Sequence, residues 1–314
     1  MGIWLDAAER ESLGRAVLAA WPEPSPPRLT WLAEGFGSAA FESQDGIIAL
    51  VAKNEIGVHS RRVTCILTRE IAPVLSIAVP MPLWRVEESP GLPFGAYAYT
   101  KVPGRLMTEG DAAAFSAPVA EEIGAFLFVM HSYPLSRATE RALPGFEALW
   151  QDMASLRSTT DATLRRRLTS GEYARVQAWW EAFLGDEALA QAPRCLVHGD
   201  LWPHNLLVDE PGKQLLGVID FGDVQVIDAA YDFAPLRISR TLFDGALAAY
   251  ERLGGVIDAG FEHRLERWWE LRTGSWFSLR AAIRADDTEE IEDALGQLRR
   301  SPILARPGAG RGSL

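Results

Sequence analysis

The fold is decided by the stretch CLVHGDLWPHNLLVDEPGKQLLGVIDFGD, which runs from Cys195 to Asp223. Two apolar runs in it, 206–209 and 215–219, flank a polar segment that contains Pro211 and Gly212. Proline fixes φ and glycine tolerates a positive φ, so this pair suits the two central positions of a type II turn. The stretch therefore predicts a β-hairpin that brings residues 205 and 220 together at its open end.

The residues at that open end carry the chemistry. Asn205 offers a neutral oxygen and Asp220 an anionic one, and Mg²⁺ prefers a few protein oxygens together with phosphates and water. Asp200 precedes Asn205 by five residues, on a loop expected to pass beside the same point. A carboxylate near a metal and a phosphate can accept the proton of an attacking hydroxyl. The spacing therefore predicts a magnesium site with Asp200 as the base.

Upstream of this stretch, apolar runs separated by turn residues predict a small antiparallel sheet. The Asp45-Gly46 pair between two such runs is a typical hairpin signal. We expect strands at 29–32, 39–42, 47–53 and 79–86, a short extended hinge at 97–104, and helices at 7–20 and 61–74.

Downstream of the hinge the apolar spacing becomes helical. Helices are expected at 118–131, 146–157 and 172–184, followed by a long helical run from 241 to about 298. The sequence thus predicts an α+β fold with a small sheet-rich N-terminal lobe, 1–100, and a larger, mainly helical C-terminal lobe, 101–305. The glycine-rich tail, 306–314, is expected to be disordered.

Composition narrows the class of function. The chain of 314 residues carries a formal net charge of −11, which argues against nucleic acid as a partner because phosphates favour a basic surface. No run approaches the ~20 apolar residues of a membrane span, and the N-terminus lacks the basic and apolar regions of a signal peptide. The two distant cysteines, Cys65 and Cys195, are expected to be reduced thiols. We therefore predict a cytoplasmic protein without a membrane or nucleic-acid partner.

The motif His198-Gly-Asp200-x4-Asn205, followed by Ile-Asp220-Phe-Gly, resembles the catalytic and metal-binding motifs of the aminoglycoside phosphotransferase and choline kinase-like superfamily. Its members share the two-lobed fold of protein kinases. The resemblance implies a small-molecule kinase that moves the γ-phosphate of ATP or GTP to a hydroxyl. It assigns the base to Asp200, the Mg²⁺ ligands to Asn205 and Asp220, and a loop-bracing or helix-capping role to Asp232.

The resemblance also locates a nucleotide site in the N-terminal lobe. The segment Glu34-Gly-Phe-Gly-Ser38 resembles the loop that covers the nucleotide, and the hinge 97–104 is similar to the family's hinge. The implied nucleotide-binding residues in these two segments are Gly35, Gly37, Ser38 and Tyr99.

A kinase-like lobe should also supply a cation to the phosphates, paired with a helix glutamate. Glu70 fits the helix position, but counting without gaps places Leu50 where the cation is expected. Lys53 lies three residues later, on the opposite face of a regular strand. We favour Lys53, which a bulge or a longer hairpin would bring to the right face, and keep Arg61 and Arg62 as alternatives.

The acceptor that the resemblance suggests first is an aminoglycoside, a cationic antibiotic. Macrolide, homoserine, choline-type and sugar acceptors are alternatives, because one catalytic core serves divergent helical lobes. Acidic residues would have to meet the ammonium groups of an aminoglycoside. The candidates are Asp223, Glu266 and Glu270, with Asp228 and the run 286–290 as further acids.

Two hypotheses from other classes accompany the kinase. The ambiguity between Leu50 and Lys53 allows a weakly active, kinase-like binding protein. A metal hydrolase could be built on His198, Asp200, His204 and Asp220, and bound zinc would favour it.

Overall fold

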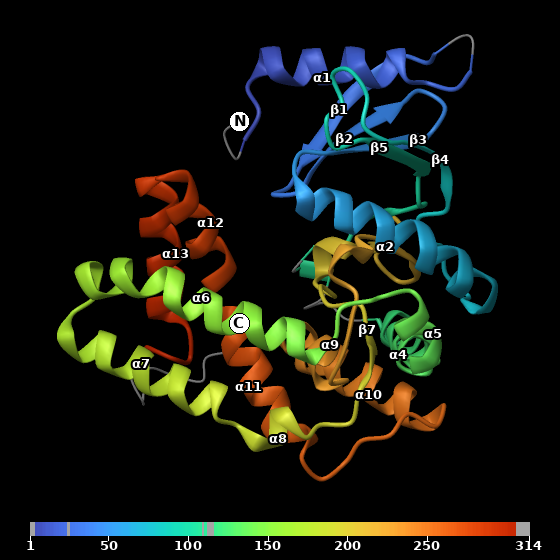
Figure 1. Cartoon of the computed structure of the whole chain (residues 1–314). Helices are drawn as coiled ribbons and strands as arrows, with labels where there is room; N and C mark the ends of the chain where they lie inside the picture. Colours follow the sequence, from blue (N-terminus) through green and yellow to red (C-terminus); the bar gives the residue numbers. More distant parts are fainter. Residues whose placement is uncertain (1–3, 24–25, 109, 112–115, 306–314) are drawn as a thin grey trace. The chain divides into compact units, whose positions relative to one another are not determined.

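The computed structural model describes residues 4–23, 26–108, 110–111 and 116–305. The predicted disordered tail, 306–314, lies outside the described residues. The chain forms two compact units (Figure 1). Unit 1 comprises Met1–Val129 and Trp202–Val224, and unit 2 comprises Met130–Leu201 and Gln225–Leu314. Unit 1 thus includes residues 101–129 and 202–224, which the sequence assigns to the C-terminal lobe. The division into lobes 1–100 and 101–305 stays a prediction.

Unit 1 contains an antiparallel sheet of five strands. In spatial order they are β1 (Leu29–Glu34), β2 (Ser38–Ser43), β3 (Ile47–Ala52), β5 (Ala96–Thr100) and β4 (Pro82–Val86). Gly46 has φ +72° in the turn between β2 and β3, a conformation that glycine adopts without steric cost. The hairpin predicted around Asp45-Gly46 is therefore confirmed.

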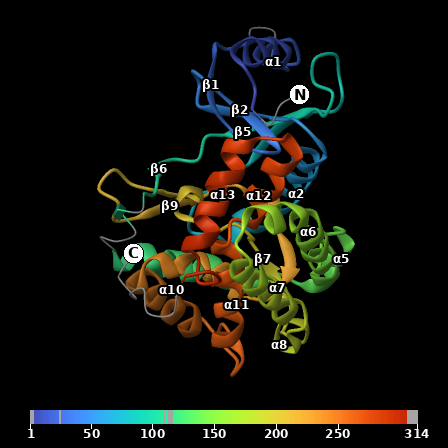
Figure 2. The same ribbon diagram turned by 90° about the vertical axis from the view of Figure 1, so that its left-hand side faces the viewer.

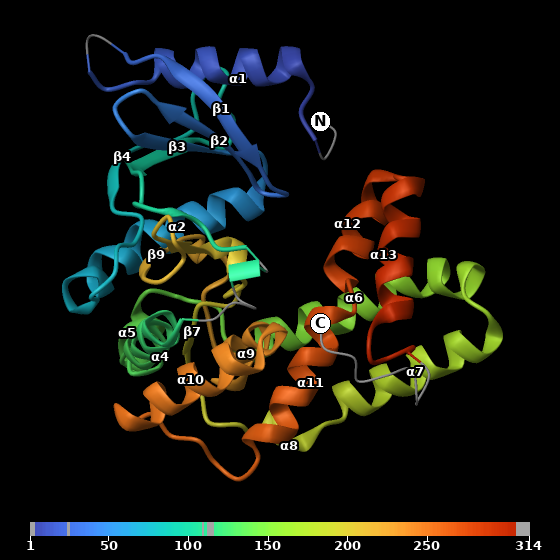
Figure 3. The same ribbon diagram turned by 180° about the vertical axis from the view of Figure 1, so that it is seen from behind.

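Helix α1 (Ala7–Ala19) covers one face of this sheet and α2 (Glu55–Ile71) covers the other, as Figures 1 and 3 show. The core on the α1 side gathers Val17, Phe41 and Val51, each at most 4% exposed. Side chains of this size stabilise a fold by about 1.5–3 kcal/mol each when fully buried. The other face carries a smaller cluster of Ile48, Tyr97 and Tyr99, with Leu50 and Cys65 packed against it. Successive residues of each strand point to opposite faces of the sheet, so they contribute to the two cores in turn.

The predicted start of the helix at residue 61 is wrong, because α2 begins at Glu55. Asn54 is its N-cap, and the Asn54 side chain accepts hydrogen bonds from the backbone N–H groups of Ile56 (3.0 Å) and Gly57 (3.3 Å). The helix ends at Ile71 and is followed by the 3-10 turn η1 (Ala72–Val74).

Unit 1 also holds the predicted second hairpin, formed by β8 (Leu206–Val208) and β9 (Leu215–Val218) and extended by β6 (Arg105–Leu106). Its turn closes one residue earlier than predicted, since the Gly212 N–H donates to the Asp209 carbonyl at 2.9 Å. Glu210 and Pro211 are therefore central, and Gly212 follows with φ +69°. Unit 1 further includes most of α4 (Ala117–His131) and the 3-10 turns η2 (Pro203–Asn205) and η3 (Phe221–Asp223).

Unit 2 is mainly helical, with one two-stranded sheet of β7 (Cys195–Val197) and β10 (Gln225–Ile227). Its N-terminal helices are α5 (Leu135–Glu140), α6 (Phe146–Arg167), α7 (Ser170–Leu184) and α8 (Glu187–Ala190). The later elements are α9 (Ala230–Phe233), η4 (Pro235–Ile238), α10 (Arg240–Arg252), α11 (Phe261–Thr273), α12 (Trp276–Ala285) and α13 (Thr288–Arg300). Helices α12 and α13 lie side by side in Figures 2 and 3.

The long helical run expected from 241 to about 298 is helical over most of its length. It is divided into α10, α11, α12 and α13. The breaks fall where the backbone takes a left-handed conformation, at Gly254 (φ +100°), Ser275 (φ +54°) and Asp286 (φ +55°). Such residues end a helix because their carbonyls leave the helical path.

The core of unit 2 contains a cluster of aromatic side chains. Trp180, Phe183, Trp268 and Trp276 are fully buried, and the Trp180 and Trp276 rings lie 4.9 Å apart. Aromatic pairs of this kind stabilise a core beyond the area that they bury. Among the described helices, none has the length and apolar character that a membrane span requires.

Candidate active site

The β8–β9 hairpin joins the backbone at the two predicted metal ligands. Leu206 pairs with Val218, and the Ile219 N–H donates to the Asn205 carbonyl at 3.0 Å. The Asn205 side chain is buried within unit 1, at 4% exposure. Asp220 follows Ile219 directly, so the hairpin brings the amide and the carboxylate to the same end, as the sequence predicts.

Asp220 is exposed and has a strained backbone, and the segment that follows it packs closely within unit 1. It adopts φ +64°, a left-handed conformation that is uncommon outside glycine and that recurs at functional sites. Burial and the nearby Asp220 carboxylate both raise the pKa of Tyr99. Phe221 is fully buried against Phe126, at 6.2 Å between ring centroids. A Cβ atom on Gly222 would lie 2.5 Å from Ser60 Oγ, so η3 packs closely on α2.

The predicted nucleotide loop rests on the start of α2. The Asn54 side-chain amide donates to the Phe36 carbonyl at 2.8 Å, while its oxygen caps the helix. A Cβ atom on Gly57 would lie 2.1 Å from the Gly37 carbonyl oxygen, so only glycine permits this approach. Asn54 and Gly57 are absent from the predicted site residues. The signal was an N-cap residue before a helix with glycine in its first turn.

Lys53 has a partner that the sequence analysis did not consider. Its Nζ lies 3.4 Å from Glu34 Oε2, and the two side chains are 6% and 7% exposed. Glu34 also accepts from Arg10 Nη2 at 3.0 Å and from the Leu5 N–H at 3.2 Å. Burial raises the pKa of Glu34, but the Leu5 N–H, the charge and hydrogen bond of Lys53 and the hydrogen bond of Arg10 together outweigh burial, so the net shift of this pKa is downward. The predicted pairing of Lys53 with Glu70 stays a prediction.

The bulge that would bring Lys53 to the face of Leu50 is absent from the β2–β3 pairing. Its register runs without a shift from Ser38–Ala52 to Glu42–Ile48. Lys53 therefore follows Ala49 and Val51 toward the α1 side, where its ammonium also lies 5.5 Å from the Trp4 ring. Of the alternative cations, Arg61 is engaged elsewhere. It donates to the Val86 carbonyl at 2.6 Å and pairs with Glu87 at 3.1 Å.

The loop that carries the predicted base lies in unit 2 and is held by a buried carboxylate. Asp232 is fully buried and accepts from the backbone N–H groups of His198 (2.7 Å) and Gly199 (2.8 Å). It also lies 3.3 Å from His131 Nε2. The fully buried His198 ring accepts the Asp200 N–H through Nδ1 at 3.2 Å. Asp232 thus braces the loop, one of its two expected roles, and the contacts of His198 are structural.

Asp200 pairs with Arg272 of α11, which the sequence analysis missed. Arg272 Nη2 donates to Asp200 Oδ1. The two residues are 72 positions apart, so local sequence carried no signal for this contact. Asp200 belongs to unit 2, whereas Asn205 and Asp220 belong to unit 1. The expected proximity of Asp200 to that pair stays a prediction.

Three of the acidic residues expected to meet a cationic acceptor already have arginine partners within unit 2. Asp228 is 1% exposed and accepts from Arg264 Nε (2.8 Å) and Trp268 Nε1 (2.9 Å), which makes it part of the core. Glu266 pairs with Arg237, and Glu270 accepts from Arg267 (3.0 Å) and Trp179 (2.9 Å).

The remaining acids differ in their surroundings. Asp287, in the run 286–290, caps α13 by accepting from the N–H groups of Glu289 and Glu290, both at 3.1 Å. Asp223 is exposed at the end of η3, in unit 1. Binding of an acceptor by Asp223, Glu266 or Glu270 stays a prediction.

The donor set at the hairpin fits magnesium by its chemistry. One carboxylate and one amide oxygen are the few protein ligands that Mg²⁺ uses beside phosphates and water. Within the described part of the chain, no group of three or more His, Cys, Asp or Glu residues is placed to hold a metal ion.

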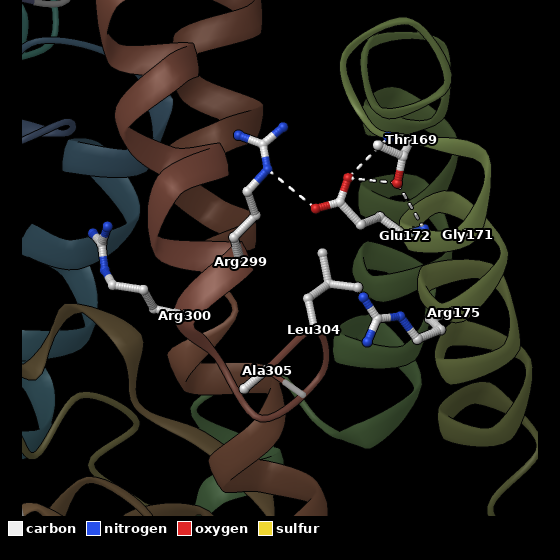
Figure 4. Close-up of a pocket in the computed structure, with 8 residues that line it drawn as sticks. All are labelled: Thr169, Gly171, Glu172, Arg175, Arg299, Arg300, Leu304 and Ala305. Atoms are coloured by element: carbon white, nitrogen blue, oxygen red, sulfur yellow. Dashed lines mark hydrogen bonds and ion pairs between the residues drawn. The ribbon is translucent and has the colours of Figure 1, made fainter. Parts of the chain in front are cut away.

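Unit 2 also contains a pocket of ≈ 960 Å³ between the start of α7 and the end of α13 (Figure 4). Within it, Arg299 pairs with Glu172 at 3.3 Å, and Glu172 accepts the backbone N–H of Thr169, the N-cap of α7, at 2.9 Å. None of the predicted site residues lines it. Its lining consists of Thr169, Gly171, Glu172, Arg175, Arg299, Arg300, Leu304 and Ala305.

The sequence profile of the phosphotransferase enzyme family matches residues 66–269, more than half of the chain. The chain belongs to this family. The resemblance to phosphotransferases is confirmed. The prediction that the chain is a small-molecule kinase is confirmed as well.

Solved structures of the class show the same fold. Aminoglycoside 2'-phosphotransferase-IIIa in complex with GDP is 18% identical with a TM-score of 0.78, and the match covers 92% of this chain and 97% of that one. Macrolide 2'-phosphotransferase MphH from Brachybacterium faecium is 21% identical with a TM-score of 0.65, covering 94% and 98% of the two chains. The predicted kinase-like fold is therefore confirmed.

A curated relative is similar over a shorter range. The "Uncharacterized protein YcbJ" of Bacillus subtilis (strain 168) is 30% identical over 91 residues. The match covers 27% of this chain and 28% of the length of that relative.

Proposed function

We propose that this phosphotransferase moves the γ-phosphate of ATP or GTP to a hydroxyl of a small molecule. The observation that carries the proposal is the β8–β9 hairpin, in which the Ile219 N–H binds the Asn205 carbonyl at 3.0 Å and so joins Asn205 to the segment of Asp220. A paired amide and carboxylate at this position suit a magnesium–nucleotide complex.

The residues predicted for catalysis, magnesium binding and nucleotide covering each have a role in this proposal. Asn205 and Asp220 hold Mg²⁺, which when bound supplies positive charge to the β- and γ-phosphate oxygens. Asp200 accepts the proton of the acceptor hydroxyl as its oxygen attacks the γ-phosphorus. The loop of Gly35, Gly37 and Ser38 covers the nucleotide. Tyr99 lines the nucleotide site.

Lys53 remains the proposed phosphate-binding cation, with Glu70 as the helix glutamate of the family pattern. Lys53 lies toward α1, whereas Glu70 belongs to α2 on the other face of the sheet, so this role requires the Lys53 side chain to leave Glu34 and turn away from α1. We also propose a cytoplasmic location, which the two free cysteines support.

For the acceptor we propose an aminoglycoside first, because solved structures of this fold include aminoglycoside phosphotransferases. One observation favours a second candidate, a macrolide. Glu266 and Glu270 already pair with Arg237 and Arg267, so the ammonium groups of an aminoglycoside would compete with these arginines. An acceptor with fewer positive charges avoids that competition.

The test is a matrix of ATP and GTP against a panel of aminoglycosides and macrolides, with formation of nucleoside diphosphate as the readout. The Asp200→Asn variant should lower kcat by about 10²–10⁴-fold while nucleotide still binds, because general-base catalysis contributes about that much. Asp244→Asn is the matched control, since Asp244 is 58% exposed on α10.

Two results would contradict the proposal. One is an absence of turnover with every acceptor together with melting that does not respond to magnesium and nucleotide. The other is an Asp200→Asn variant with the wild-type rate.

A further inference from the structure

The ion pair of Asp200 and Arg272 holds a positive charge beside the carboxylate of the predicted base. Arg272 lies in the last turn of α11, and its Nη2 donates to Asp200 Oδ1. The Arg272 side chain is 9% exposed and that of Asp200 is 22% exposed. A pair this little exposed is screened by water far less than a surface pair.

Arg272 packs against aromatic side chains within unit 2. Its Nη1 donates to the Tyr231 hydroxyl at 3.1 Å, and its guanidinium lies 5.3 Å from the centre of the Tyr231 ring. Tyr231 is 3% exposed and meets Trp268 edge to face at 5.0 Å. The planar guanidinium therefore has little freedom, and its direction toward Asp200 is set by the core.

Two separate groups thus fix the predicted base. Asp232 holds the main chain of the loop through the His198 and Gly199 N–H groups. Arg272 holds the side chain of Asp200 through one of its two carboxylate oxygens. Since a misplacement of about 1 Å can cost about 10²-fold in rate, a device that fixes the carboxylate has a catalytic consequence.

We propose that Arg272 is a positioning residue that fixes the Asp200 carboxylate through Oδ1 and so directs Oδ2 to the acceptor hydroxyl. This inference rests on the proposed function. In the step, the hydroxyl oxygen forms a bond to the γ-phosphorus and its proton passes to Asp200 Oδ2. The bond between the γ-phosphorus and the bridging oxygen breaks, and its electron pair leaves with the nucleoside diphosphate.

The chemistry of phosphoryl transfer favours such a device. The transition state is loose, so the protein contributes positioning more than a strong base. An arginine that holds one carboxylate oxygen restricts the direction from which the hydroxyl approaches the carboxylate. In a reaction limited by alignment, that restriction raises the rate.

The experiment is a double-mutant cycle of Asp200→Asn and Arg272→Ala, read as kcat and KM for acceptor and nucleotide. Arg272→Ala should lower kcat by about 10- to 100-fold and leave the nucleotide KM within about twofold. In the Asp200→Asn background the same change should alter kcat by less than about threefold, because the group it positions is already lost. Arg272→Lys should recover part of the rate, since it keeps the charge but not the planar fork.

Arg240→Ala is the matched control, because Arg240 is 92% exposed on α10 and pairs with its helix neighbour Asp244. An equal loss of kcat from Arg272→Ala in both backgrounds would overturn the proposal and assign Arg272 a purely structural role. An unchanged kcat in Arg272→Ala would overturn it as well.

A failure of the proposed function gives a different result. A wild-type chain that phosphorylates no acceptor contradicts that function, and the cycle is then read on two acceptor-independent measurements. These are the basal hydrolysis of ATP or GTP and the midpoint of unfolding in urea. Coupling between Asp200 and Arg272 in the basal hydrolysis supports the positioning role, and additivity in that hydrolysis overturns it. The midpoint of unfolding reports only whether each variant is folded, because an ion pair that merely stabilises the fold would show coupling there as well.

Discussion

The Asp232→Ala substitution removes a buried carboxylate on which the loop before Asp200 depends. Asp232 is fully buried and accepts the N–H groups of His198 and Gly199 at 2.7 and 2.8 Å. A buried donor left without an acceptor costs about 1–3 kcal/mol. The loss of both bonds should therefore destabilise unit 2 by about 2–6 kcal/mol. Asp232→Asn keeps one acceptor oxygen and should cost about 1–3 kcal/mol.

The assay is equilibrium unfolding in urea, followed by circular dichroism, with kcat measured on the same preparations. Asp244→Ala serves as the control, because Asp244 is 58% exposed and makes an i,i+4 pair with Arg240. Its free energy of unfolding should change by no more than about 0.5 kcal/mol. The reasoning is refuted if Asp232→Ala unfolds within about 1 kcal/mol of the wild type.

The acid response of this variant has a definite sign. Burial alone raises the pKa of Asp232, but the hydrogen bond and charge of His131, the charge of His198 and the Gly199 N–H lower it, and the net shift is downward. A carboxylate with a depressed pKa in the folded state stabilises the protein above the ordinary aspartate pKa of about 4. That contribution is lost as the pH falls through the folded-state pKa. As the pH falls below about 4, the free energy of unfolding should therefore decrease less in Asp232→Asn than in the wild type.

Two further substitutions test the nucleotide-binding half of unit 1. Gly57→Ala should destabilise the chain by about 1–3 kcal/mol and raise the nucleotide KM, because the added Cβ would lie 2.1 Å from the Gly37 carbonyl oxygen. Lys53→Met should cost about 1–3 kcal/mol in urea unfolding, since it removes a partner from Glu34, whose side chain is 7% exposed. A role in phosphate binding would add a rise in nucleotide KM to that loss of stability.

Matched controls exist for both substitutions. Gly171→Ala in α7 adds a Cβ with nothing within 4 Å and should not lower stability. Lys101→Met removes an ion pair with Glu42 in which the lysine is 46% exposed, and should cost less than about 1 kcal/mol. Wild-type stability in Gly57→Ala would show that the backbone of Gly37 can move away from residue 57 without cost. Wild-type stability in Lys53→Met would show that the ion pair with Glu34 does not stabilise the fold.

The sequence by itself determined the features that depend on local spacing. The hairpin that joins Asn205 to the segment of Asp220 follows from two apolar runs on either side of a proline–glycine turn. The sheet hairpin at Gly46 follows from the same kind of pattern. Turn geometry and strand alternation act over a few residues, so sequence spacing is sufficient to predict them. The exact turn position was missed because the Asp209 side chain binds the N–H groups of Lys213 and Gln214 and reshapes the turn.

The tertiary structure alone decided which charges meet. In the folded chain Arg272 pairs with Asp200, Glu34 with Lys53 and Arg264 with Asp228, across separations of 72, 19 and 36 residues. Such contacts depend on how helices and strands pack, and many pairings of acidic and basic residues fit the same sequence equally well. The chemistry at residues 198–220 could therefore be predicted from the chain, whereas the partner that orients its base could not.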